Sequence, residues 1–99
     1  MAISKREDNY MSALEKLYEK VTVAIGELAE NNRNISHLEE EIAKLTSPYS
    51  KEGRIARCGA VSAAVKSGDD ERAEELVNRF LLEDGIDANL SDKLRALLS

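Results

Sequence analysis

Apolar side chains recur every three or four residues along most of the first half of the chain. Because residues at this spacing share one face of an α-helix, residues 4–46 are predicted to be helical, with one long apolar stripe. No proline interrupts the stripe before Pro48, and good helix formers such as Glu, Lys, Leu and Ala fill the positions between. The stripe comprises Met11, Leu14, Tyr18, Val21, Ile25, Leu28, Ile35, Leu38, Ile42 and Leu45.

The first part of the stripe follows a heptad repeat, the pattern of helices that associate side by side. In this register the a positions are Met11, Tyr18, Ile25 and Asn32, and the d positions are Leu14, Val21, Leu28 and Ile35. The flanking residues Leu17, Ala24 and Ala29 are also apolar, so the stripe is wider than the seam of a simple two-stranded zipper. A single helix cannot shelter such a stripe. We therefore expect a homodimer or a larger helical bundle, with the nine stripe residues from Leu14 to Leu45 as the oligomer seam.

One stretch in the middle of the stripe is ambiguous. Residues 30–34 contain three asparagines, which weaken a helix and favour a turn. Ser36 and Glu39, three residues apart, have the spacing of a capping box that begins a new helix. The step from Ile35 to Leu38 also breaks the heptad phase of the preceding residues.

Two structures fit this stretch. One is an asymmetric helical hairpin with arms over residues 4–30 and 36–46. The other is a single helix about 60 Å long, at the usual rise of about 1.5 Å per residue. The continuous helix is slightly favoured, because neither Gly nor Pro lies at the joint.

A second helix is expected after a clear boundary at Ser47 and Pro48. Pro48 suits the first helical position, with Ser47 as its cap. The helix is expected to run to about Ser67 and to end at Gly68. Residues 58–65 carry no charged side chain, and a helix segment that is uncharged all round is usually buried.

Two further short helices follow. Asp69 is expected to cap a helix over about 70–83, which has the apolar spacing of one buried face. A last helix is expected over about 90–98, with Asn89 or Ser91 as its cap. No stretch alternates in the manner of a β-strand.

These elements predict an all-α fold. A long N-terminal coiled-coil-like helix, or an asymmetric hairpin, precedes three shorter helices. We expect residues 1–46 to form a helical oligomerisation segment and residues 47–99 to form a compact helical region. Together they are expected to build an oligomeric helical bundle.

Charge is unevenly distributed along the chain, whose net charge is −5. Six basic residues face nine acidic ones over residues 1–46, four face one over residues 47–68, and four face nine over residues 69–99. The basic residues that lie at helical spacing in the middle segment are Lys51, Arg54 and Arg57. They are candidate contacts for nucleic acid or for an acidic partner. The alternative is pairing with the acidic third helix inside the chain.

Few residues suggest a catalytic or metal-binding site. His37, Glu40 and Glu41 have a spacing found in helical metal sites, but no second ligand cluster accompanies them. Cys58 and His37 are the single cysteine and the single histidine, without the motif that a nucleophile and its base require. We therefore expect a protein that is not an enzyme and that uses neither a cofactor nor a metal.

Location follows from cysteine use and hydropathy. With Cys58 alone, no disulfide can form within the chain, which fits a reducing cytoplasm. No run approaches the roughly 18 apolar residues that cross a membrane. The charged first residues lack the apolar core of a signal peptide. We expect a cytoplasmic protein without a membrane partner.

The expected function is that of a non-catalytic oligomerising adaptor, inhibitor or regulator. Its partners would be a second copy of itself and another protein. Nucleic acid is less favoured, since acidic residues dominate both ends of the chain. One alternative is a small nucleic-acid-associated regulator that uses the basic residues of the middle segment. Another is an acidic inhibitor, of the type that phages encode, whose carboxylates imitate a nucleic-acid backbone.

Overall fold

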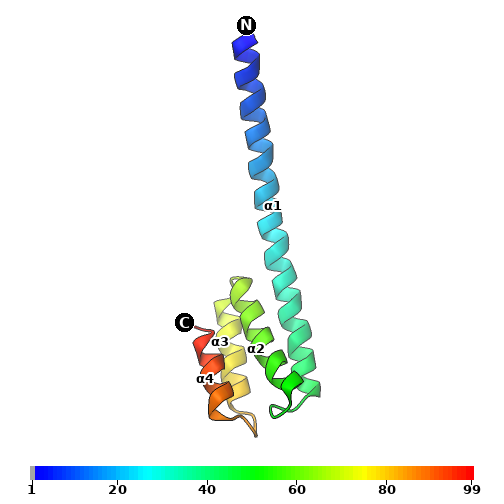
Figure 1. The fold of residues 1–99 in the computed structure, drawn as a ribbon, viewed down its shortest axis with the longest axis vertical. Helices are drawn as coiled ribbons and strands as arrows, with labels where there is room; N and C mark the ends of the chain where they lie inside the picture. The colour runs from blue at the N-terminus through cyan, green and yellow to red at the C-terminus, as the bar shows by residue number, and fades with distance from the viewer. Residues whose placement is uncertain (1) are drawn as a thin grey trace.

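The structure, a computed structural model, describes the backbone of residues 2–99 and the side chains of residues 12–99. It has α1 (Ala2–Leu45), α2 (Lys51–Lys66), α3 (Asp70–Leu81) and α4 (Ala88–Ala96), and no strand over these residues. Figure 1 shows α1 as one long rod with the three shorter helices packed beside its C-terminal part. The predicted all-α fold, with a long first helix and three shorter ones, is confirmed. Over the described residues, no helix has the length and apolar character to span a bilayer.

The continuity of α1 excludes the hairpin. Ser36 does not cap a new helix, because it lies inside α1 and is fully buried. Its hydroxyl donates a 2.7 Å hydrogen bond to the carbonyl of Ala60 in α2 and accepts one from Arg72 Nε of α3 at 3.1 Å. The serine therefore joins three helices, and the capping-box interpretation of its spacing was wrong.

The boundary after α1 is a short turn, and α2 begins three residues later than expected. The backbone N–H of Ser50 donates to the Ser47 carbonyl at 3.1 Å, and the Ser47 hydroxyl accepts from the Tyr49 N–H. Ser50 is the N-cap, because its hydroxyl accepts from the Gly53 N–H at 3.0 Å. Pro48 therefore lies in the turn and does not begin the helix.

The end of α2 and the starts of α3 and α4 agree in part with the sequence predictions. Gly68 follows α2 with a φ of 82°, and Asp69 caps α3 by accepting from the Arg72 N–H at 3.0 Å. The cap of α4 is Asp87, whose carboxylate accepts from the Leu90 N–H at 2.8 Å. The expected caps of this last helix were wrong, because the aspartate three residues before Leu90 already satisfies that donor.

The core lies between α2, α3 and α4 and is small. The uncharged run of α2 supplies much of it, as predicted, although its first residues are half-buried and Val65 lies at the edge. Among the α1 residues whose side chains are described, only Ala43 joins this apolar cluster. The fully or almost fully buried members are Ala56, Ala60, Val61, Ala64, Ala73, Leu76, Val77, Leu90 and Leu94. The core thus contacts the last turns of α1, and the apolar stripe of α1 takes no part in it.

Two glycines offer a matched test of this packing. A Cβ at Gly53 would lie 1.8 Å from the Ser47 carbonyl oxygen, whereas a Cβ at Gly26 meets nothing within 4 Å. Gly53→Ala is expected to destabilise the fold by about 1–3 kcal/mol, because the turn must move. Gly26→Ala is expected to stabilise α1 by roughly 0.5–1 kcal/mol. Thermal unfolding of both variants checks the opposite signs, and equal shifts would contradict the placement of this turn.

Candidate functional site

The N-terminal half of α1 projects away from the rest of the molecule. The radius of gyration is 20.5 Å and the extents are 73 × 24 × 19 Å, whereas a compact domain of this length has a radius near 13 Å. From residue 12 to residue 28 every side chain is exposed except Leu14, which is half-buried. This part of α1 has no packing against α2, α3 or α4 (Figure 1).

The C-terminal part of α1 packs on α2 through small and polar residues. Ser36, Glu40 and Ala43 are buried there, and Asn32 is half-buried. The apolar residues of the same segment lie on a neighbouring face and remain exposed. The contact that orders the molecule therefore leaves the predicted stripe free.

The apolar stripe is uncovered along the whole described length of α1. Its large side chains are between 43% and 87% exposed, apart from Leu14. The exposed ones are Tyr18, Val21, Ile25, Leu28, Ile35, Leu38, Ile42 and Leu45, and the flanking Leu17 is exposed as well. Nearly all the residues expected to form an oligomer seam thus lie on one accessible helix; Met11, at the start of the stripe, lies outside the residues whose side chains are described.

Because α1 is continuous, the heptad register can be followed without a break. Residues spaced by seven fall at Leu14, Val21, Leu28, Ile35 and Ile42, which take position a. Three residues after each come Leu17, Ala24, Asn31, Leu38 and Leu45, which take position d. We call these ten residues the α1 seam. The phase break expected between Ile35 and Leu38 is absent in this register, in which Asn32 is half-buried and lies off the seam, one turn before Ser36.

The α1 seam is about 47 Å long, because its ends are 31 residues apart at about 1.5 Å per residue. It carries no charged side chain, and its only polar member is Asn31. Tyr18 and Ile25 flank it and widen the apolar face. The seven-residue spacing of both sets of seam residues can be read from the sequence. The heptad register assigned in the sequence analysis, however, placed Asn32 in the seam and Asn31 outside it.

A buried cluster of ion pairs connects α3 to α1. Glu40 of α1 is 8% exposed, and its carboxylate accepts from Arg72 at 2.8 Å and from Arg79 at 2.6 Å. Burial alone would raise the pKa of Glu40, but the hydrogen bonds and charges of the two arginines outweigh it and lower the pKa. His37 lies at the edge of this cluster, 3.9 Å from Glu40. Within residues 12–99, no group of acidic, histidine or cysteine side chains is arranged to hold a metal.

The Glu40 cluster predicts a dependence of stability on pH. A carboxyl group whose pKa is lowered by folding stabilises the fold above its unfolded pKa, near 4.5, and ceases to do so as the pH falls through the lower folded value. The stability advantage of the wild type over Glu40→Gln is therefore expected to shrink between pH 7 and pH 3. Urea unfolding at several pH values measures this difference. A difference that stays constant would show that Glu40 is not ionised in the cluster.

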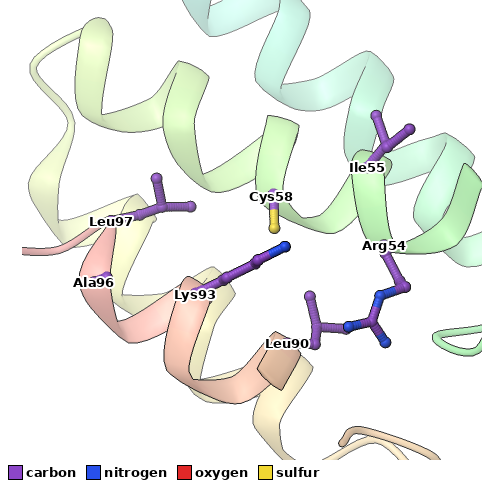
Figure 2. A pocket seen from close by; sticks show the side chains of 7 residues that line it. All are labelled: Arg54, Ile55, Cys58, Leu90, Lys93, Ala96 and Leu97. Atoms are coloured by element: carbon purple, nitrogen blue, oxygen red, sulfur yellow. The ribbon is translucent and has the colours of Figure 1, made fainter. Parts of the chain in front are cut away.

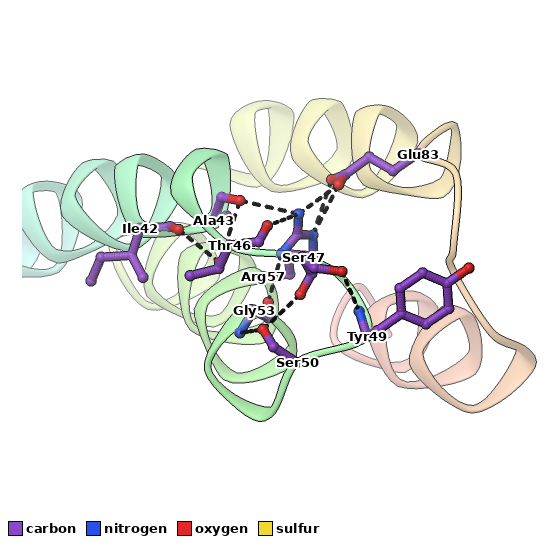
Figure 3. A network of polar contacts seen from close by, with 9 residues as sticks. All are labelled: Ile42, Ala43, Thr46, Ser47, Tyr49, Ser50, Gly53, Arg57 and Glu83. Carbon is purple, nitrogen blue, oxygen red and sulfur yellow. Dashed lines mark hydrogen bonds and ion pairs between the residues drawn. The ribbon is translucent and has the colours of Figure 1, made fainter.

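Arg57 was a candidate surface contact, with pairing inside the chain as the alternative, and the structure places it at 2% exposure. Its guanidinium donates to the carbonyls of Ala43 and Thr46 at 3.1 Å and to that of Gly53 at 2.9 Å. It also pairs with Glu83 at 2.6 Å (Figure 3). The arginine therefore joins the C-terminal end of α1 to α2 and to the segment after α3, and its charge suits the negative end of the α1 dipole.

The three candidate basic contacts do not form one exposed patch. Arg57 is buried, and Arg54 forms an ion pair with Asp87 at 2.6 Å that lowers the pKa of Asp87. Lys51 remains exposed at the start of α2. Pairing within the chain, which was the alternative for these residues, accounts for both arginines, although their partners follow α3 and precede α4.

Cys58 lines an open pocket of about 420 Å³ between α2 and α4. Figure 2 shows the side chain of Lys93 reaching toward its sulfur from α4. Burial raises the pKa of the Cys58 thiol, and the nearby charges of Lys93 and Arg54 offset only part of this. The thiol is therefore protonated at neutral pH and a weak nucleophile. His37 is exposed on α1 and is not among the residues of this pocket.

Comparisons with known proteins add no counterpart. No family model matches the sequence, and neither a curated protein nor a solved structure matches it. Among the described residues, the α1 seam is an apolar surface that no other part of the fold covers.

Proposed function

We propose that this protein is a non-catalytic, self-associating binding protein. In this proposal the α1 seam joins copies of the chain, and the assembly acts as an adaptor, inhibitor or regulator by binding another protein in the cytoplasm. The observation that carries the proposal is the uncovered seam, in which nine of the ten residues at strict heptad spacing are exposed on one helix and Leu14 is half-buried.

Physical reasoning supports a partner for this helix. Most helical stability in proteins comes from packing of an apolar face, and residues 12–28 have no such packing within the chain. Soluble monomers rarely expose a contiguous apolar surface of this extent, and surfaces that do so usually bind another protein or a membrane. A seam with a heptad repeat favours another helix as the occupant.

The nucleic-acid alternative gains little from the geometry, since two of its three basic residues are paired. The acidic-inhibitor alternative has an exposed surface on α3, formed by Glu71, Glu74 and Glu75. Retention on heparin at low salt separates these alternatives. A regulator that binds nucleic acid would be retained, whereas an acidic protein would pass through.

Affinity capture with matched variants tests the proposed function. The wild-type chain, Val21→Asp and Val23→Asp serve as baits, because Val21 lies in the α1 seam and Val23 on the opposite face of the same helix. We expect the wild type and Val23→Asp to retain the same protein partner and Val21→Asp to lose it. Equal capture by all three baits would show that the α1 seam has no part in binding.

A further inference from the structure

The α1 seam also indicates how two copies are arranged. We propose that a second copy covers it with its own α1, parallel and in register, so that the two Asn31 side chains meet. This inference rests on the proposed function, because it names the occupant of the same surface. Three features carry it: the residue types of the seam, the place of Asn31, and the position of α2.

The residue types favour two parallel strands. Three of the five a positions hold a β-branched residue (Val21, Ile35 and Ile42), and three of the five d positions hold leucine (Leu17, Leu38 and Leu45). β-Branched residues at a with leucine at d are typical of parallel dimers. Trimers and tetramers prefer isoleucine at both positions or leucine at a with isoleucine at d, and no d position of the α1 seam holds isoleucine.

Asn31 distinguishes the two directions. In a parallel, in-register pair it lies opposite Asn31 of the second copy, and each amide can both donate and accept. In an antiparallel pair with full overlap, Leu14 lies opposite Leu45, which places Asn31 opposite Leu28. That arrangement buries two amides against leucine, where their donors and acceptors have no partner, and this is costly.

Charged residues beside the seam favour the antiparallel arrangement, but only weakly. The antiparallel arrangement brings Lys20 of one copy beside Glu41 of the other, a favourable pair that forms twice. An exposed ion pair of this kind contributes less than a buried amide without a partner costs. In the parallel arrangement Lys20 faces Ile25 and Glu27 faces Asn32, so no like charges meet. The amide cost therefore exceeds the ionic gain.

The rest of the fold leaves room for this partner. α2 packs on the side of α1 that holds Ser36, Glu40 and Ala43, about a third of a turn away from Leu38 and Ile42. The seam side chains beside α2 remain exposed, with Leu38 at 64%. A second α1 thus extends the packing of α1 without displacing α2.

Cysteine cross-linking tests the direction. In a Cys58→Ser background, Leu38→Cys places a thiol opposite its own counterpart in the parallel arrangement. In the antiparallel arrangement residue 38 lies opposite residue 21, so only a mixture of Leu38→Cys and Val21→Cys chains can form the mixed disulfide. Val23→Cys, on the opposite face, serves as the control. Before oxidation, sedimentation gives the mass of each sample.

We expect oxidation to convert Leu38→Cys alone into a covalent dimer, while Val23→Cys stays monomeric in denaturing gels. A mixed disulfide that forms only between Leu38→Cys and Val21→Cys chains would overturn the parallel direction and leave self-association intact. A mass above that of a dimer would overturn the two-stranded arrangement. A mass of one chain before oxidation would overturn the inference together with the proposed self-association.

Discussion

Val21→Asp is expected to reduce the assembly to single chains while leaving the packed core of α2, α3 and α4 intact. Val21 is 55% exposed in one chain, so the aspartate is well solvated in the monomer. In an assembly the same carboxylate would be buried in the α1 seam without a partner, which costs several kcal/mol per copy. Light scattering measures the loss of mass, and circular dichroism checks that α2, α3 and α4 remain helical.

Val23→Asp is the control for this result, because Val23 is the same residue type, is 58% exposed and lies on the opposite face of α1. Its mass is expected to equal that of the wild type. Ile25→Asp, at a position that flanks the seam, should have a smaller effect than Val21→Asp. If the two valine variants had equal masses, the seam would not be the surface that joins the copies.

Arg57→Ala is expected to cause a large loss of stability within one chain, about 3–5 kcal/mol, because it removes a buried arginine from its ion pair and from the carbonyls that it satisfies. The substitution leaves the Ala43 and Thr46 carbonyls without their donor and frees Glu83 from its pair. It also removes a cation 5.8 Å from the centre of the Phe80 ring. Urea unfolding measures the effect, best in a Val21→Asp background so that concentration does not alter the midpoint.

Arg54→Ala is the matched control, since Arg54 is one turn earlier in α2 and its pair with Asp87 lies at the surface. We expect little change in its unfolding midpoint, because exposed ion pairs contribute little. Equal midpoints for the two alanine variants would contradict the structural role assigned to Arg57.

Much of the architecture could be predicted from local patterns. The three- and four-residue spacing identified α1, and Gly68 and Asp69 marked the junction of α2 and α3, because each of these signals acts within a few residues. The starts of α2 and α4 were misplaced by two or three residues, since several adjacent side chains are suitable caps. Which of them accepts the backbone N–H depends on the turn that precedes it.

The roles of polar residues could not be predicted, because they depend on contacts between distant segments. Ser36 has the spacing of a cap, yet it bonds across to α2 and α3, 24 and 36 residues away. Arg57 has the character of a surface cation, yet it is buried among carbonyls of α1 and α2. The register of the α1 seam also required the fold, because the partial burial of Asn32 and the exposure of Asn31 show which asparagine remains on the free face.

Sedimentation equilibrium of the wild-type chain over a wide range of concentrations is the most direct test of the central claim that the α1 seam joins two copies. One chain has a mass of 11.0 kDa, and twice that value is expected once dimers form, with dissociation only on dilution. A mass of 11.0 kDa that persists at the highest concentration, with α1 still fully helical, would contradict it.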